Sequence, residues 1–126
     1  MSYLYLGQPY SHPTPHIMNL RFLEGERVAA EILRTGRSVY APIVHNHRMA
    51  WRRQLPDDHD FWLRYCFDML RKADALLVLE IEGWEESRGL NAEIGMAQVA
   101  GIPIHHLRPC NMTRAWTDEI LMGAGL

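Results

Sequence analysis

The chain has 126 residues, the size of one ordinary domain, and 48% of them are hydrophobic, which is enough for a buried core. The formal net charge of −2 leaves no broad basic field for nucleic acid. No apolar run approaches the roughly 20 residues of a membrane span, and the N-terminus lacks a basic region followed by a long apolar stretch. We therefore expect one cytoplasmic domain over residues 1–126, with neither nucleic acid nor membrane as a partner.

The first part of the chain reads as a strand, a helix and a second strand. Residues 3–7 form a short apolar run that Gly-Gln-Pro ends, which is typical of a buried strand and a turn. Thr14 and Pro15 are residue types favoured at the start of a helix, and Gly36 supplies its end. Residues 38–42 are predicted to form the second strand.

A polar stretch over residues 43–59 follows, and we predict that it is a loop. Loops of this length are uncommon in a compact domain and are often functional. His45 and His47 lie in it. Asp57 or Asp58 can cap the next helix, which is expected to continue to residue 73.

The second half of the chain alternates again between strands and helices. Residues 74–81 are apolar at their centre without alternation, as expected for a parallel strand covered on both faces. A turn at 83–89, a helix at 90–100, a strand at 102–107 and a last helix over about 113–122 follow. This order predicts an α/β fold of three layers: a flavodoxin- or Rossmann-like parallel sheet of four or five strands with helices on both faces.

Parallel sheets bind ligands outside the carboxyl ends of their strands, beside the switch point in strand order. The turns expected to converge there are residues 7–11, 43–60 and 82–89.

Glu93 is the most informative residue at this edge. Leu90, Ile94 and Ala97 define the core face of its helix, and Glu93 lies at the edge of that face. A carboxylate there is unusual. A capping box does not explain it because position 90 is leucine, and attraction to the helix N-terminus explains it only in part. A carboxylate that faces the cleft can attack the anomeric carbon of a sugar and form a covalent glycosyl intermediate, while Ser87 and the glycine backbone hold sugar hydroxyls or a phosphate.

Other candidates are less specific. The first turn allows close approach of a ligand at Gly7, but it is no Gly-x-Gly-x-x-Gly fingerprint, and alone it is an ordinary turn with a buried Tyr5. The histidines and the acids after them have no fixed spacing and no thiolate, so no metal site is expected. The aromatic residues that can stack on a base, or simply pack in the core or a lid, are Tyr10, Trp62 and Trp84. Cys66 and Cys110 belong to no motif, and we expect no disulfide between them.

Five segments of the sequence resemble a small bacterial and phage family. They are Tyr5-Leu6-Gly7-Gln8-Pro9-Tyr10-Ser11, Ala41-Pro42-Ile43-Val44-His45-Asn46-His47, Asp60-Phe61-Trp62, Ala73-Asp74-Ala75-Leu76-Leu77-Val78-Leu79, and Gly83-Trp84-Glu85-Glu86-Ser87-Arg88-Gly89 with Ala92-Glu93-Ile94. That family is similar to the nucleoside 2-deoxyribosyltransferases and the deoxynucleoside monophosphate N-glycosidases. The resemblance spans about residues 3–107.

The resemblance implies a five-stranded sheet and a nucleophilic glutamate in a Gly-x-x-x-Glu-Φ-Gly pattern, which Gly89, Glu93 and Gly95 match. It also implies that Tyr5 orients the glutamate and that the turn from Gly7 through Gln8 and Pro9 to Tyr10 contacts the sugar or its 5′ group. It implies homo-oligomers, dimers or tetramers, whose neighbouring subunit often completes the site, and no cofactor or metal.

Two positions depart from that pattern. Ser87 stands where the transferases carry an aspartate six residues before the glutamate, and Cys66 stands where they carry another. Cleavage of an N-glycosidic bond needs protonation of the leaving base or strong stabilisation of it. The groups that could substitute stay open: Asp60, Asp68, His45 or His47.

The leading expectation is a deoxyribosyltransferase or N-glycosidase that acts on a nucleoside or nucleotide, with Glu93 and Tyr5 as catalytic residues. The substrate-binding candidates are Gly7, Gln8, Pro9, Tyr10, His45, His47, Asp60, Trp84, Ser87 and Gly89. The alternatives are a non-catalytic module that senses a nucleotide or nucleotide-sugar in the same cleft, and a structural or partner-binding protein. The fold alone does not rank them.

Overall fold

Four parallel strands form one sheet in the order β2-β1-β3-β4, as the computed structural model shows. It describes residues 2–56, 58–109 and 113–126. The elements in chain order are β1 Leu4–Gly7, α1 Pro15–Arg34, β2 Val39–Tyr40, α2 Pro42–Arg52, α3 His59–Leu70, β3 Ala75–Leu79, α4 Arg88–Ala100, β4 Ile104–Leu107 and α5 Arg114–Gly123. The expected α/β fold with a parallel sheet is confirmed.

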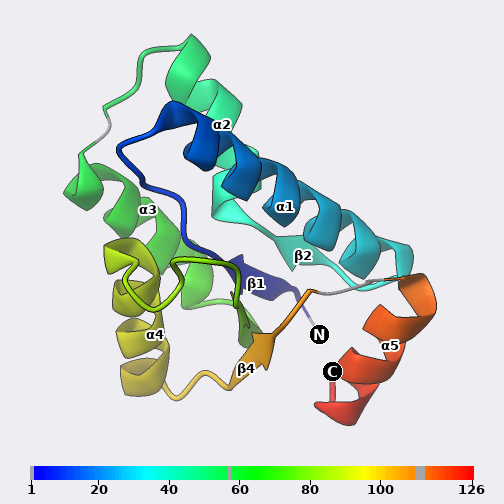
Figure 1. The fold of residues 1–126 in the computed structure, drawn as a ribbon. Coiled ribbons are helices and arrows are strands. Elements are labelled where there is room, and N and C mark those ends of the chain that lie inside the picture. The colour runs from blue at the N-terminus through cyan, green and yellow to red at the C-terminus, as the bar shows by residue number, and fades with distance from the viewer. Residues whose placement is uncertain (1, 57, 110–112) are drawn as a thin grey trace.

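Helices cover both faces of the sheet (Figure 1). Helices α1 and α5 lie on one face, and α3 and α4 lie on the other. Successive residues of a strand point to opposite faces, so Leu4 and Leu6 of β1 join the core beneath α1, while Tyr5 joins the core beneath α3 and α4. This alternation aims the Tyr5 side chain at α4.

The ends of α4 are fixed by local chemistry. The Ser87 hydroxyl accepts a hydrogen bond from the Leu90 backbone N–H at 3.2 Å, which satisfies a free donor of the first turn. Gly101 ends the helix in the left-handed conformation, with φ of 72°, where glycine has no Cβ penalty. Between these ends, Leu90, Glu93 and Ala97 are the buried positions.

The prediction of a loop over residues 43–59 is wrong, because α2 occupies Pro42–Arg52. Pro42 stands at the first helical turn, where its fixed φ suits a helix. The sequence of this helix resembles a loop because its middle is polar, with His45, Asn46 and His47 in a row, and because one of its two buried residues is the polar Asn46. The Asp58 carboxylate accepts from the Asp60 N–H and caps α3, whereas Asp57 and Cys110 lie outside the described residues.

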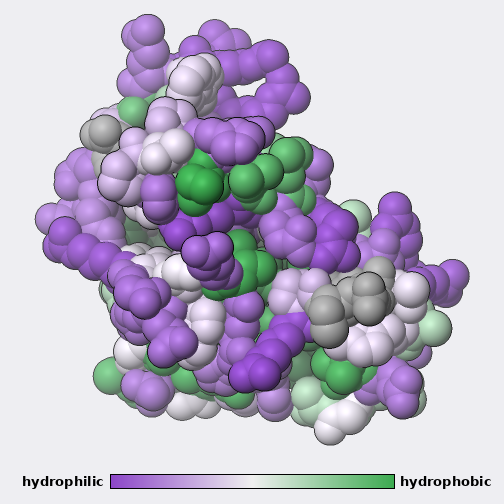
Figure 2. Space-filling view, viewed as in Figure 1, coloured by the Kyte–Doolittle hydropathy of each residue, from purple (hydrophilic) through white to green (hydrophobic). Residues whose placement is uncertain are grey.

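The surface of the molecule is largely hydrophilic in the view of Figure 2, with hydrophobic groups exposed over the first half of α1. Leu20 and Leu23 of that helix are 47% and 45% exposed. Among the residues that the structure describes, none of the helices combines the length and the apolar character that a bilayer crossing requires.

Candidate active site

A buried tyrosine and a buried glutamate meet between β1 and α4. The Tyr5 hydroxyl donates a hydrogen bond to Glu93 Oε2. Tyr5 is fully buried and Glu93 is 7% exposed. A Cβ on Gly7 would lie 2.9 Å from Leu90 Cδ1, which is too close, and 3.6 Å from Glu93 Oε1, which is an ordinary contact, so the glycine makes room for Leu90 beside the carboxylate.

Burial controls the ionisation of this pair. Burial raises the pKa of Glu93 to about 8, and the hydrogen bond from Tyr5 opposes the rise. Burial, and next the Glu93 carboxylate, raise the pKa of Tyr5 far above its ordinary value, so the phenol stays a donor. Glu93 is therefore mostly protonated at pH 7 and ionises in the mildly alkaline range. Such a carboxyl can act as an acid when protonated and as a nucleophile when ionised.

A thiol lies beside the pair. Burial raises the pKa of Cys66 on α3 to about 11, and the Glu93 carboxylate adds to the rise. The thiol is therefore neutral at physiological pH and a weak proton donor. Nothing at Cys66 replaces the acid that the family resemblance would place there.

An aromatic wall with unsatisfied polar atoms borders Tyr5. The Tyr40 ring lies 5.7 Å from the Tyr5 ring and 5.8 Å from the His45 ring, measured between centroids. The Tyr40 hydroxyl and Asn46 Oδ1 are both buried, and neither forms a well-aligned hydrogen bond within the described part of the chain, although the Tyr65 and Asn46 side chains lie beside the Tyr40 hydroxyl. Buried polar atoms in native proteins are nearly always paired, so unpaired ones call for a ligand or water. Neither Tyr40 nor Asn46 is recognisable as a site residue from the sequence, because Asn46 takes a buried position only in the context of α2.

The first turn ties the site to α1 and α2. Gln8 turns toward α1, where its Nε2 donates to the Arg21 carbonyl at 2.8 Å, and Nε2 also lies 3.4 Å from the Pro9 carbonyl. The Tyr10 hydroxyl lies 2.5 Å from His47 Nδ1. The structure thus joins Tyr10 and His47, while Gln8 fastens the turn to α1.

Three further candidate substrate-binding residues, Ser87, Gly89 and Trp84, lie around the start of α4. The Ser87 hydroxyl is engaged by the helix cap. A Cβ on Gly89 would meet nothing within 4 Å, so packing does not require glycine there. Trp84 packs beside the Tyr5 core and lies edge-on to His106, with ring centroids 5.5 Å apart.

The candidate proton donors lie in different surroundings. Asp60 is exposed in the first turn of α3. The Asp68 side chain is 62% exposed and pairs with Arg71 at 3.3 Å. His47 is held by Tyr10, whereas His45 is exposed beside Tyr40.

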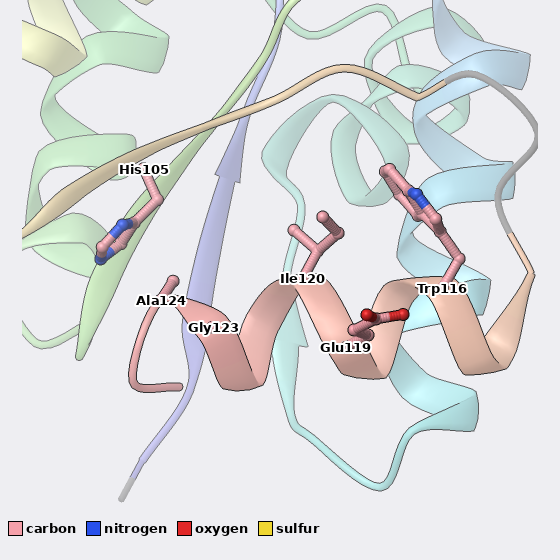
Figure 3. Close-up of a pocket in the computed structure, with 6 residues that line it drawn as sticks. All are labelled: His105, Trp116, Glu119, Ile120, Gly123 and Ala124. Carbon is pink, nitrogen blue, oxygen red and sulfur yellow. The ribbon is translucent and has the colours of Figure 1, made fainter.

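Glu93 lines neither of two hollows in the surface. The larger, about 820 Å³, lies between β4 and α5 (Figure 3). The residues around it are His105, Trp116, Glu119, Ile120, Gly123 and Ala124. The smaller, about 280 Å³, lies between α1 and α2. Within residues 2–56, 58–109 and 113–126, no three His, Cys, Asp or Glu side chains gather closely enough to hold a metal ion.

Fold and site together define an α/β parallel-sheet protein with a buried tyrosine–glutamate pair at the carboxyl edge of its first strand. Residues 2–108 match a family model described as a domain of unknown function (DUF1937), and the chain belongs to that family. No curated protein matches the chain.

Proposed function

We propose that this protein cleaves the N-glycosidic bond of a nucleoside or nucleotide, as a deoxyribosyltransferase or an N-glycosidase. The observation that carries the proposal is the hydrogen bond from Tyr5 to the buried Glu93, next to the bare backbone of Gly7. A buried carboxyl with a raised pKa and one fixed donor is typical of a catalytic group. The resemblance of the surrounding segments to the nucleoside 2-deoxyribosyltransferases points to the same residues.

The chemistry would proceed in two steps. Ionised Glu93 attacks C1′ of the sugar, a bond forms between its carboxylate oxygen and C1′, and the C1′–N bond breaks with its electron pair going to the base. Water or a second base then forms a bond to C1′, the bond between C1′ and the Glu93 oxygen breaks with its electron pair returning to the carboxylate, and the deprotonated His45, which protonates the base in the first step, takes the proton that the attacking group loses. Tyr5 holds the carboxylate in place during both steps.

The departing base needs a proton or an equivalent hydrogen bond. Asp68 already pairs with Arg71, and His47 is tied to Tyr10. His45 is exposed beside Tyr40, which in turn contacts Tyr5. We therefore propose His45, which is linked to Tyr5 through Tyr40, as the proton donor in preference to Asp60, which is exposed in the first turn of α3.

The test is a panel of deoxynucleosides and their 5′-monophosphates, with free base followed by chromatography. Release by the wild-type protein and its loss in Glu93→Gln support the proposal. Glu85→Gln, which changes an exposed carboxylate of the turn before α4, is the matched control and should keep full activity. No release from any compound, or equal release by Glu93→Gln, would refute it.

A second candidate function is a non-catalytic sensor of a nucleotide or nucleotide-sugar. The neutral Cys66 thiol at a position expected to carry an acid favours it. A nucleotide that raises the melting temperature yet is recovered intact would support the sensor over the enzyme. In either case we propose a cytoplasmic homo-oligomer, for which the exposed Leu20 and Leu23 on α1 offer an apolar surface.

A further inference from the structure

The proposed reaction does not use the residues that line the hollow between α1 and α2. Its lining comes from the start of α1 and the second half of α2. The residues are Pro15, Asn19, His47, Arg48, Trp51 and Arg52. Its volume of about 280 Å³ is that of a small ligand site, and Tyr5 and Glu93 do not line it.

Positive charge is concentrated in the second half of α2. Residues 42–56 contain three arginines, Arg48, Arg52 and Arg53, and no Asp or Glu, although the whole chain is slightly acidic. Arg48 and Arg52 form no ion pair with any residue that the structure describes. Four residues apart on α2, they present two guanidinium groups side by side to an anion.

The start of α1 adds to this charge. The Thr14 side chain forms no capping hydrogen bond, so the positive end of the α1 dipole is left without a side-chain acceptor. Pro15, the first residue of that helix, lines the same hollow. An anion bound between the helices is therefore favoured by α1 as well as by the two arginines.

Trp51 supplies an aromatic face at the same place. It is 76% exposed, although tryptophan is usually well buried, and it lies between the two arginines in sequence. The helix dipole favours basic residues near the C-terminus of α2, so it explains the arginines there. It does not explain why an indole is exposed at the same place. Aromatic faces next to arginines are how proteins bind nucleobases that carry phosphate.

The floor of the hollow is rigid. His47 stacks on Phe22 with ring centroids 4.3 Å apart, and its Nδ1 is held by the Tyr10 hydroxyl. Burial, and next the charge of Arg48, lower the pKa of His47, so the imidazole is neutral at pH 7. Because the His47 side chain is held in place and uncharged, the selection of an anion depends on Arg48 and Arg52.

We propose that this hollow is a nucleotide-binding site, separate from Glu93, in which the base stacks on Trp51 and the phosphate is bound by Arg48 and Arg52. The site is independent of the proposed reaction. It provides a place for a nucleotide that regulates the protein, whether or not Glu93 cleaves one.

The test is titration calorimetry on the Glu93→Gln protein, which excludes turnover. The probes are deoxyadenosine and thymidine 5′-monophosphates, the two nucleosides, and inorganic phosphate. We expect a monophosphate to bind and the double variant Arg48→Gln/Arg52→Gln to weaken that binding by about tenfold or more. Trp51→Ala should weaken it to a similar degree, and the nucleosides and phosphate should each bind about tenfold more weakly than the monophosphate.

Arg53→Gln is the matched control, because Arg53 has the same charge at the same end of α2 but does not line the hollow. Binding should change little in that variant. The proposal is overturned if neither monophosphate binds, if the double variant binds as the parent does, or if Arg53→Gln weakens binding equally. A short single-stranded deoxyoligonucleotide that binds more tightly than the monophosphates would also overturn it, in favour of a polynucleotide surface. Base release is measured separately, so failure of the proposed reaction leaves this test intact.

Discussion

The hydroxyl of Tyr5 on β1 donates its hydrogen bond to Oε2 of Glu93 on α4, across a separation of 88 residues in the sequence. Both side chains are buried, so the contact joins the centre of the sheet to the helix that covers it. A hydrogen bond that lowers the pKa of a buried carboxyl favours its ionised form, which is the form that attacks a sugar. The predictions below follow from this contact and from the residues around it.

The change Tyr5→Phe should shift the pH dependence of base release to higher pH. It removes the one group that opposes the rise in the Glu93 pKa. A hydrogen bond to a charged group contributes about 1.5–3 kcal/mol, which corresponds to a pKa rise of about 1–2 units. A pH–rate profile of kcat for both proteins measures the shift. If kcat of wild type and of Tyr5→Phe depended on pH in the same way in the alkaline range, Tyr5 would not act through the Glu93 carboxyl.

The change Glu93→Gln should stabilise the protein above about pH 8 and have little effect near pH 4.5. Unfolded Glu93 loses its proton near 4.5, whereas the folded protein holds it until about 8. Within that window the folded state binds more protons, so wild-type stability falls by up to about 1.4 kcal/mol per pH unit. Because glutamine cannot ionise, the stability of the Glu93→Gln protein does not fall with pH in this way.

Thermal unfolding of both proteins at pH 5 and pH 9 tests the difference. Glu85→Gln, at an exposed position, should show the same pH dependence as wild type. A Glu93→Gln protein that is destabilised equally at both pH values would mean that Glu93 is ionised in the fold.

Much of the arrangement around Glu93 was accessible from sequence. The continuous apolar run that became β3 identified a doubly covered parallel strand, and the strand–helix alternation gave the sheet. The period of α4 placed Glu93 at the edge of the core face, and the structure buries it. These features are local, because they depend on periodicity within one element.

The parts that sequence did not reveal depend on contacts between elements. Helix α2 is polar through its middle and buries Asn46, so its residues resembled a loop. The unpaired Tyr40 hydroxyl, the Tyr10–His47 bond and the hollow at Trp51 all require two elements to be placed relative to each other. Residue patterns within a single sequence do not specify how two elements are placed relative to each other.

The change Gly7→Ala should destabilise the protein and reduce base release. Its Cβ would lie 2.9 Å from Leu90 Cδ1, so Leu90 must shift against its packed neighbours. Overpacking of this kind costs about 1–3 kcal/mol, and movement of Leu90 disturbs Glu93 one turn further along the helix. Denaturant unfolding and the base-release assay measure the two effects.

Gly89→Ala is the control for that change. No atom lies within 4 Å of the Cβ that it adds, and the position is helical. It should raise stability by about 0.4–1 kcal/mol through reduced entropy of the unfolded chain. Equal stability losses in both variants would show that contact with Leu90 is not the cause.

The change Tyr40→Phe should leave stability unchanged or slightly raised, and should weaken substrate binding. The Tyr40 hydroxyl is buried and forms no well-aligned hydrogen bond among the described residues, although Tyr65 and Asn46 lie beside it, so removing it relieves a poorly satisfied polar group. Tyr3→Phe provides the contrast, because the Tyr3 hydroxyl donates to the Met69 carbonyl, and its loss should cost about 1 kcal/mol. Unfolding in denaturant separates the two variants. If the Tyr40 hydroxyl binds substrate, KM rises in Tyr40→Phe while the fold keeps its stability; a stability loss as large as that of Tyr3→Phe would instead assign this hydroxyl to a bond within the fold.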